Sequence, residues 1–310
     1  MAGPVSNKKE RQPLLSARKK TRLTEFLFVL PALILLAVFT YYPVAKLVQI
    51  SFTDWNLLSP DWKYVGLKNW RWLFMGSGSK YLWNSLKITF LYSLGEITVT
   101  LVGGMLFALL FRRMTRGFGL MRAVVFIPKY VAMSSAAVVF LWILNTDYGV
   151  LNYLLKLLGL QPVDWLNQKS TALISVLMLT GWRVIGYGMM IYLSAMMGIS
   201  QQYYEAASLD GATKAQQFFK ITLPLLSPTT LFLLVTTFLS SMKVFQSVDI
   251  LTSGGPSRST EVFVYLIYRY AMVDFRMDRA ATSAVMFFII LLMITVATMK
   301  FSNNTVNYDS

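Results

Sequence analysis

Three charged side chains lie inside long apolar runs, where a charge is costly and needs a role. Glu96, Lys129 and Arg183 each fall within a stretch that is otherwise apolar enough to cross a bilayer. A charge at the centre of a membrane helix costs about 2.5 to 3.5 kcal/mol on insertion scales, so each requires a partner or water. Glu96 and Arg183 are expected at similar depth, which predicts a buried ion pair or network between helices. The alternative is contact with a substrate.

The sequence lacks most of the residues that usually carry out covalent catalysis or bind metal ions. The chain has no cysteine and no histidine, which excludes disulfides, thiolate or imidazole metal sites, and Cys–His or Ser–His nucleophilic pairs. It has no G-x-x-x-x-G-K-[ST] loop, since GSGSK at 76–80 lacks the spacing, and no G-x-S-x-G motif. We therefore expect no enzyme activity, metal or cofactor in this chain itself.

The composition places those charges in a membrane protein. Of 310 residues, 55% are hydrophobic and only 14% are charged, which is too apolar for a soluble domain of this size. The net charge of +15 is concentrated beside apolar runs, where it orients helices and meets anionic lipid. We expect membrane lipid as a partner, and no nucleic acid.

The fold class predicted is all-α integral membrane, with six transmembrane helices. The apolar runs are 26–45, 86–111, 123–145, 171–197, 225–242 and 281–299. The first run has 20 residues without a charge, enough to span about 30 Å and too long for a signal-peptide core, so we expect an uncleaved helix. The domains expected are a basic tail (1–25) that is disordered over 1–22, a helical domain (26–300) and a second tail (301–310).

The positions of the cations predict the orientation. The tail holds seven Lys and Arg residues and the short loop 112–122 holds four, whereas 11 cations are spread over three longer loops. Dense clusters in short segments beside spans favour the cytoplasmic side. Both termini are therefore expected in the cytoplasm, together with the loop between the fourth and fifth helices.

That cytoplasmic loop is a polar hairpin over 203–228, YYEAASLDGATKAQQFFKITLPLLSP. Its alanines let another protein's surface approach closely, and its Phe, Ile and Leu residues provide an apolar side. Asp210 is expected to be the N-cap of a second short helix, and Gly211 permits the bend before it. Such a loop is suited to dock into a partner's groove.

The spacing within the hairpin resembles the EAA signature of permease subunits in bacterial ABC importers. The matching residues are Glu205, Ala206, Ala207, Gly211, Ile221, Leu223 and Pro224. In that family the loop, here 200–228 and including Asp210, forms a coupling helix that sits in a cleft of the ATPase subunit. The resemblance implies the same role for these residues, and a type I ABC importer permease fold.

Two outer segments resemble the carbohydrate-uptake branch of that family. The segment 51–74 contains SFTDWN and YVGLKNWRWLF, which are similar to the loop after the first helix in carbohydrate-importer permeases. The pattern DxLTxGGP, from Asp249 to Pro256, resembles importers of di- and oligosaccharides and glycerol phosphates. The resemblance covers about 26–298.

Resemblance to the maltose-importer permease also implies a substrate pathway. Counted from Glu205, the corresponding positions are Thr180, Arg183, Val184, Tyr187, Ser240, Ser241 and Val244, with Lys129 and Met133 on an earlier helix. Most of these residues differ in type from their counterparts, which implies a shared pathway rather than a shared substrate. Hydroxyls and a phenol suit a neutral sugar, while Lys129 and Arg183 suit a carboxylate or phosphate. A neutral oligosaccharide and an anionic glycan or glycerol phosphate both stay open.

The function implied is that of a bacterial inner-membrane permease subunit in an ATP-driven sugar importer. The family implies two ATPase subunits that carry ATP and Mg, a second and distinct permease subunit, and an extracellular solute-binding protein. A secondary transporter is the first alternative, and inverted repeats would mark it. An intramembrane enzyme is the second, and it would need a base beside a reactive serine. Neither pattern is present in the sequence.

Overall fold

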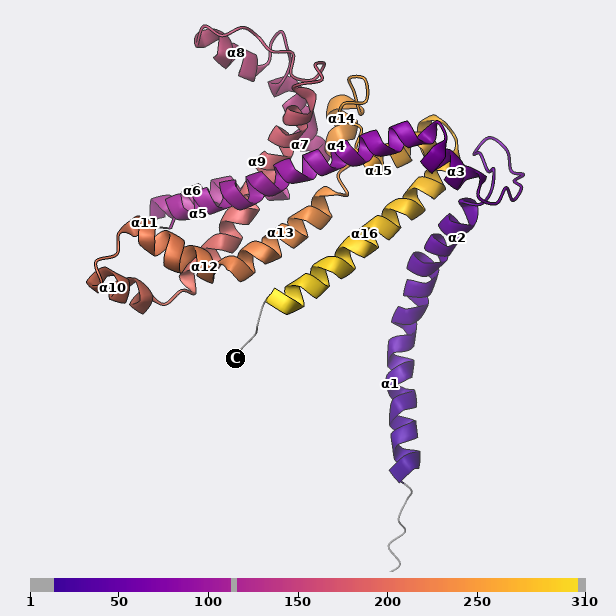
Figure 1. Cartoon of the computed structure of the whole chain (residues 1–310), viewed down its shortest axis with the longest axis horizontal. Helices are drawn as coiled ribbons and strands as arrows, with labels where there is room; N and C mark the ends of the chain where they lie inside the picture. Colours follow the sequence, from indigo (N-terminus) through magenta and orange to yellow (C-terminus); the bar gives the residue numbers. More distant parts are fainter. Residues whose placement is uncertain (1–13, 113–115, 306–310) are drawn as a thin grey trace, which may run out of the picture.

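The computed structural model describes residues 14–112 and 116–305, which are largely helical (Figure 1). The helices are α1 (Leu14–Leu36), α2 (Tyr42–Ile50), α3 (Lys68–Met75), α4 (Gly78–Thr98), α5 (Gly104–Leu110), α6 (Arg116–Phe126), α7 (Met133–Ile143), α8 (Val150–Leu157), α9 (Ala172–Met197), α10 (Gln201–Leu209), α11 (Lys214–Gln217), α12 (Leu223–Leu225), α13 (Ser227–Ser241), α14 (Gln246–Thr252), α15 (Phe263–Tyr268) and α16 (Met277–Thr305). Short 3-10 or π segments adjoin them: η1 (Ala37–Tyr41), η2 (Val99–Gly103), η3 (Ile127–Tyr130), η4 (Phe218–Thr222) and η5 (Arg269–Val273).

Four continuous helical stretches are long and apolar enough to cross a membrane. They are Thr24–Ile50, Gly78–Leu110, Ala172–Met197 and Met277–Thr298. These confirm the helices predicted from the runs 26–45, 86–111, 171–197 and 281–299. The second helix begins at Gly78, before its apolar run, because it continues beyond the part that is apolar enough to lie in the membrane.

The other two predicted spans are bent. Gly117–Tyr130 and Met133–Ile143 meet at 105°, so the prediction of one continuous span over 123–145 is wrong. Pro128 has no N–H to donate, and Val131 is extended, so the helix ends there. Lys214–Leu225 and Ser227–Ser241 meet at 60°, which places the fifth span close to the predicted 225–242. With each bent pair counted as one span, the described residues hold up to six.

Glycines let the central helices approach closely. A Cβ on Gly104 of α5 would lie 2.8 Å from the backbone of Gly188 on α9. A Cβ on Gly186 would meet the backbone of Val125 and Phe126 on α6. Small residues at helix crossings are a common packing device in membranes. This packing sets α4–α5 and α6 against α9, the helix that carries Arg183.

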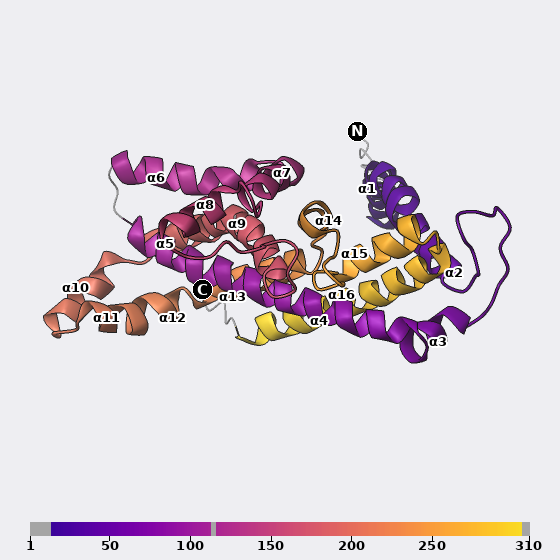
Figure 2. The same cartoon turned by 90° about the horizontal axis from the view of Figure 1, so that it is seen from above.

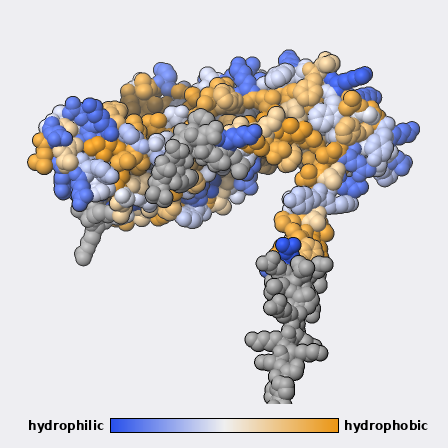
Figure 3. Space-filling view, turned by 60° about the horizontal axis from the view of Figure 1, so that its bottom comes forward, coloured by the Kyte–Doolittle hydropathy of each residue, from blue (hydrophilic) through white to orange (hydrophobic). Residues whose placement is uncertain are grey.

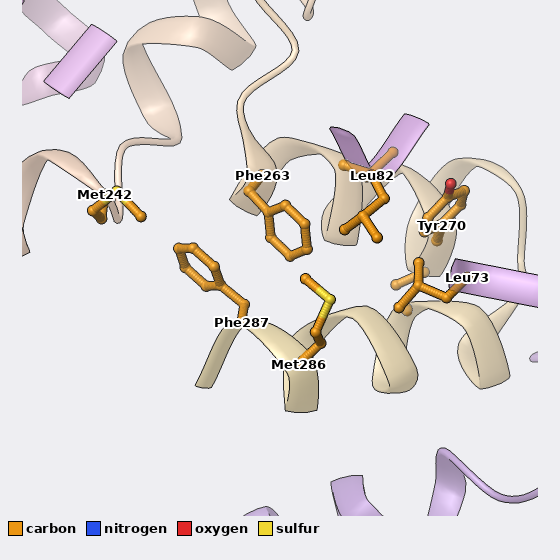
Figure 4. Close-up of a cluster of buried hydrophobic side chains, with 10 residues drawn as sticks. Leu73, Leu82, Met242, Phe263, Tyr270, Met286 and Phe287 are labelled. Carbon is orange, nitrogen blue, oxygen red and sulfur yellow. The ribbon is translucent and has the colours of Figure 1, made fainter. Parts of the chain in front are cut away.

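A cluster of buried side chains joins α3, α4, α15 and α16 (Figure 4). Leu73, Leu82 and Met286 are buried in it, and the rings of Phe263 and Phe287 stack at 4.8 Å between centroids. The last helix is therefore packed against α3 and α15. Figure 3 shows that apolar side chains also cover much of the visible outer surface, as expected for helices that border lipid or another membrane subunit.

The first helix departs from the other spans (Figure 1). None of the apolar window in Thr24–Ile50 is buried inside the chain. The predicted disorder over 1–22 is wrong for 14–22, because α1 begins at Leu14 in a stretch rich in Leu, Arg and Lys, which favour helix. Residues 1–13 of that tail, and 306–310 of the C-terminal tail, lie outside the described residues.

The hairpin of α10 and α11 lies at one end of the molecule, and α3 lies at the opposite end (Figures 1 and 2). α9 and α13 lead directly into and out of that hairpin. α4 and α5 run from α3 toward the hairpin end of the molecule (Figures 1 and 2).

Candidate functional site: a charged cavity and a polar hairpin

A cavity of about 440 Å³ lies among α4, α9, the break between α6 and α7, and the segment that follows α13. Seven residues of the predicted pathway line it, namely Lys129, Met133, Thr180, Arg183, Val184, Ser240 and Val244. Tyr187 lines an adjoining cavity of about 150 Å³, which shares Glu96, Lys129, Val184 and Ser240 with the first. Residues from distant parts of the sequence thus surround one space.

Ser241 lies on neither cavity, although the sequence predicts it on the pathway. Its side chain is buried, and its Oγ donates to the carbonyl oxygen of Phe238 at 2.8 Å. Each step along a helix rotates the side-chain direction by about 100°. Ser240 and Ser241 therefore face different neighbours, and only Ser240 reaches the cavity.

Arg183 stabilises the break between α6 and α7. Its Nη2 donates to the carbonyl oxygens of Lys129 at 3.2 Å and Val131 at 2.9 Å. Its Nη1 lies 3.6 Å from the Sδ of Met133. The last carbonyls of a helix have no partner within that helix, and hydrocarbon supplies none. The guanidinium therefore satisfies carbonyls that the 105° bend leaves free.

Glu96 and Arg183 do not form the direct ion pair that the sequence predicts. Both line the cavity, but the ion pairs within 4.0 Å among the described residues all lie in the segment 258–278. The guanidinium is already engaged by the carbonyls of the break. Lys129 instead places its Nζ 4.9 Å from the centre of the Tyr187 ring, a cation–π contact.

Sequence reasoning missed several residues of the cavity. Tyr92, Gln246 and Ser247 line it, and so does a further cation, Lys243. Lys243 directly follows the apolar run 225–242, so its position in the sequence groups it with the cations of an outer loop. A cation at the very end of a span was the signal that could have found it.

The hairpin has a compact local geometry. Asp210 is the C-cap of α10, so its predicted role as an N-cap is wrong. Thr213 is the N-cap of α11, and it forms a capping box with Gln216. The box suits Thr213 because the residue three positions later is a glutamine. Gly211 has φ of +78°, which confirms that a glycine permits the bend.

Buried hydrogen bonds join the two halves of the hairpin, and one cation–π contact joins the hairpin to the end of α5. The hydroxyl groups of Tyr204 and Thr222 are 2.9 Å apart, and the buried Nε2 of Gln217 donates to Ser208 Oγ at 2.8 Å. The guanidinium of Arg112, just after α5, lies 5.1 Å from the centre of the Tyr204 ring. These contacts favour movement of the hairpin together with the helices that it joins.

The signature residues surround one surface of the hairpin. Ala207, Asp210, Gly211 and Ile221 line a hollow of about 360 Å³. Glu205, Ala206, Leu223 and Pro224 are exposed. Leu209 is 90% exposed at the end of α10. An exposed leucine beside small residues and a hollow is the chemistry of a protein-docking surface.

The DxLTxGGP segment forms a braced turn outside the membrane spans. Glu261 is buried and pairs with Arg258 and Arg269, each at 3.1 Å. Burial raises the pKa of the Glu261 carboxyl, and the two guanidinium groups act in the opposite direction. Gly254 has φ of +76°, which the turn requires. In the described part of the chain, no group of three or more His, Cys, Asp or Glu residues could hold a metal ion.

Comparison with known families gives a match over most of the chain. The model of a family described as "Binding-protein-dependent transport system inner membrane component" matches residues 100–301. The probable ABC transporter permease protein YurN of Bacillus subtilis is 34% identical over 286 residues, which cover 91% of this chain and 97% of that protein. The sn-glycerol-3-phosphate transport system permease protein UgpA of Agrobacterium fabrum is 30% identical over 288 residues, which cover 93% of this chain and 97% of that protein.

A similar fold occurs in a solved structure. This is the crystal structure of a bacterial ABC transporter involved in the import of the acidic polysaccharide alginate. It matches with a TM-score of 0.80 at 24% identity, over 95% of this chain and 100% of the matched chain.

Proposed function

This chain belongs to the family of binding-protein-dependent transport system inner membrane components, and from that premise we propose that it is the permease subunit of an ATP-driven sugar importer. It is an integral membrane protein. The relatives include permeases for sn-glycerol 3-phosphate and, in Thermococcus litoralis, for trehalose and maltose. Hydroxyl-bearing side chains on the cavity, such as Thr180 and Ser240, suit a substrate of this class.

One observation carries the proposal. The two helices on either side of the hairpin, α9 and α13, are also two walls of the cavity. A rotation imposed on the hairpin would therefore reach Arg183 and Ser240 through short links, residues 198–200 before α10 and the 60° bend before α13. In this proposal the binding protein and ATP shift the permease between inward-facing and outward-facing states, and hydrolysis resets it.

The partners proposed are two ATPase subunits, a second and distinct permease subunit, an extracellular binding protein and membrane lipid. ATP and Mg belong to the ATPase subunits, and this chain is not itself an enzyme. A solved relative was crystallised with an alginate pentasaccharide-bound periplasmic protein, which supports the binding-protein role. The exposed first helix supports a second membrane subunit. We also propose that the termini and the hairpin lie in the cytoplasm, which the cation clusters support.

The test is ATPase activity of the assembled importer in lipid, with its binding protein and a panel of sugars. Wild type is compared with Glu205→Lys, Gly211→Pro and a control, Gln202→Ala, an exposed residue of α10 outside the signature. Proline holds φ near about −65°, which the bend at +78° cannot accept.

Stimulation by one sugar that is abolished in both signature variants, with the subunits still associated and the control unaffected, is the expected result. The proposal is contradicted if the signature variants are stimulated as strongly as wild type. It is also contradicted if no sugar stimulates the ATPase of the wild type.

A further inference from the structure

The charges around the cavity are unbalanced. Three of its lining residues are cations, Lys129, Arg183 and Lys243, and one is a carboxylate, Glu96. In the described part of the chain, none of the three cations forms an ion pair with a carboxylate within 4.0 Å. Like charges that line one cavity repel one another. The cavity therefore favours a ligand that supplies negative charge.

Buried donors on the same cavity lack acceptors. The Nε of Arg183 and the Oγ of Ser247 are both buried without a hydrogen-bond partner. A buried donor left unsatisfied costs about 1 to 3 kcal/mol. Ligand oxygens would remove that cost, and charged oxygens would do so with stronger bonds than a hydroxyl can make.

The three cations have different roles. The Nη2 of Arg183 is engaged by the carbonyls of Lys129 and Val131, and its Nη1 lies against the Sδ of Met133, so this residue mainly positions the wall. The Nζ of Lys129 lies over the Tyr187 ring. The ammonium of Lys243 has no hydrogen-bond or ring partner among the described residues, and this exposed residue lines the same cavity. Lys243 is therefore the cation that is most available to a ligand.

We propose that this cavity takes an acidic sugar, one that carries a carboxylate or phosphate, and that Lys243 is the specificity-determining contact for the acidic group. Lys129 adds a second positive charge, and Arg183 Nε and Ser247 Oγ donate to the ligand's oxygens. Glu96 opposes the anion and limits its affinity, which favours release. A volume of about 440 Å³ is within the usual range for ligand sites. This inference rests on the proposed sugar-import function.

The test is equilibrium binding to the assembled importer in nanodiscs, held with ATP and vanadate and without the binding protein. The matched probes are trigalacturonic acid and its fully methyl-esterified form, which differ in charge and little in shape. Glycerol 3-phosphate against glycerol distinguishes a phosphate from a carboxylate ligand. The variants are Lys243→Gln, the charge-preserving Lys243→Arg, and Lys87→Gln, an exposed lysine of α4 that lines neither cavity, as a control.

At least one acidic probe is expected to bind more tightly than its neutral counterpart. Lys243→Gln should weaken the binding of that acidic probe about tenfold or more, because one charged hydrogen bond is lost. The affinity for the neutral form should not change. Lys243→Arg should retain most of the preference. Glu96→Gln should tighten the acidic probe.

Equal binding of acidic and neutral probes, an unchanged preference in Lys243→Gln, or no binding of any acidic probe at millimolar concentration overturns the inference. Stimulation of the ATPase by neutral sugars alone would also overturn it while leaving the importer function intact. If no sugar of either charge stimulates the ATPase through the hairpin, the importer function itself fails.

Discussion

The hairpin and the cavity differ in how their polar groups are satisfied. In the hairpin, Thr213 and Gln216 cap each other, and Gln217 bonds to Ser208, so the partners are close in sequence. In the cavity, Arg183 bonds to carbonyls more than fifty residues away, and its Nε has no partner. The hairpin is a local structure whose capping and bracing groups are satisfied within it, and its surface is available for another protein to bind. The cavity is assembled from distant segments and is left incomplete, as a ligand site must be.

The largest effect is expected at the point where the cavity depends on a single side chain. Arg183→Met removes both hydrogen bonds to the break between α6 and α7 and should lower the free energy of unfolding by about 2 to 3 kcal/mol. Arg183→Lys should restore part of this, because an ammonium cannot reach both carbonyls with the same geometry. Thermal unfolding of the purified assembly measures both, with Lys87→Met as the control. An unchanged midpoint of thermal unfolding in Arg183→Met would show that the break between α6 and α7 does not need the hydrogen bonds from Arg183.

A smaller effect is expected where the hairpin is braced. Gln217→Met removes the buried donor to Ser208 and should cost about 1 to 2 kcal/mol locally. Faster amide hydrogen exchange in α10, with reduced sugar transport per ATP hydrolysed, would be the result. Gln202→Met, which changes an exposed glutamine of α10, serves as the control. Equal exchange in the two variants would argue that the hairpin is held by other contacts.

The next prediction separates the two candidate caps of α11. Thr213→Ala removes the capping box and should destabilise this short helix by about 1 kcal/mol. Asp210→Ala should leave the amide protection of 214–217 unchanged, because Asp210 ends α10 and does not begin α11. The reverse order of effects in hydrogen exchange would reinstate Asp210 as the N-cap.

The smallest effect is expected for the residue that the sequence paired with Arg183. Glu96→Gln breaks no ion pair, so the stability of the assembly should change by less than about 0.5 kcal/mol. A double-mutant cycle with Arg183→Met should give a coupling energy of similar size. A coupling of several kcal/mol would mean that the two charges meet directly in the assembled importer.

Much of this molecule could be read from residue order. The spans over Ala172–Met197 and Met277–Thr298 follow from apolar length alone, since hydrocarbon forces the backbone into helix. The bend at Gly211 was readable because only glycine adopts that conformation freely. The break at Pro128 was not, because a proline within an apolar run is compatible with a straight helix, a kink or a full turn.

By itself, the sequence determined the helical class, the family and the hairpin, because these depend on composition and on contacts between near neighbours. Only the tertiary structure decided which charges share a cavity. It placed Lys243 on that cavity and Ser241 off it, and it directed Arg183 to the carbonyls of a broken helix instead of to Glu96. The physical reason is that a side chain's partner depends on helix rotation and crossing, which arise from packing between segments far apart in the chain.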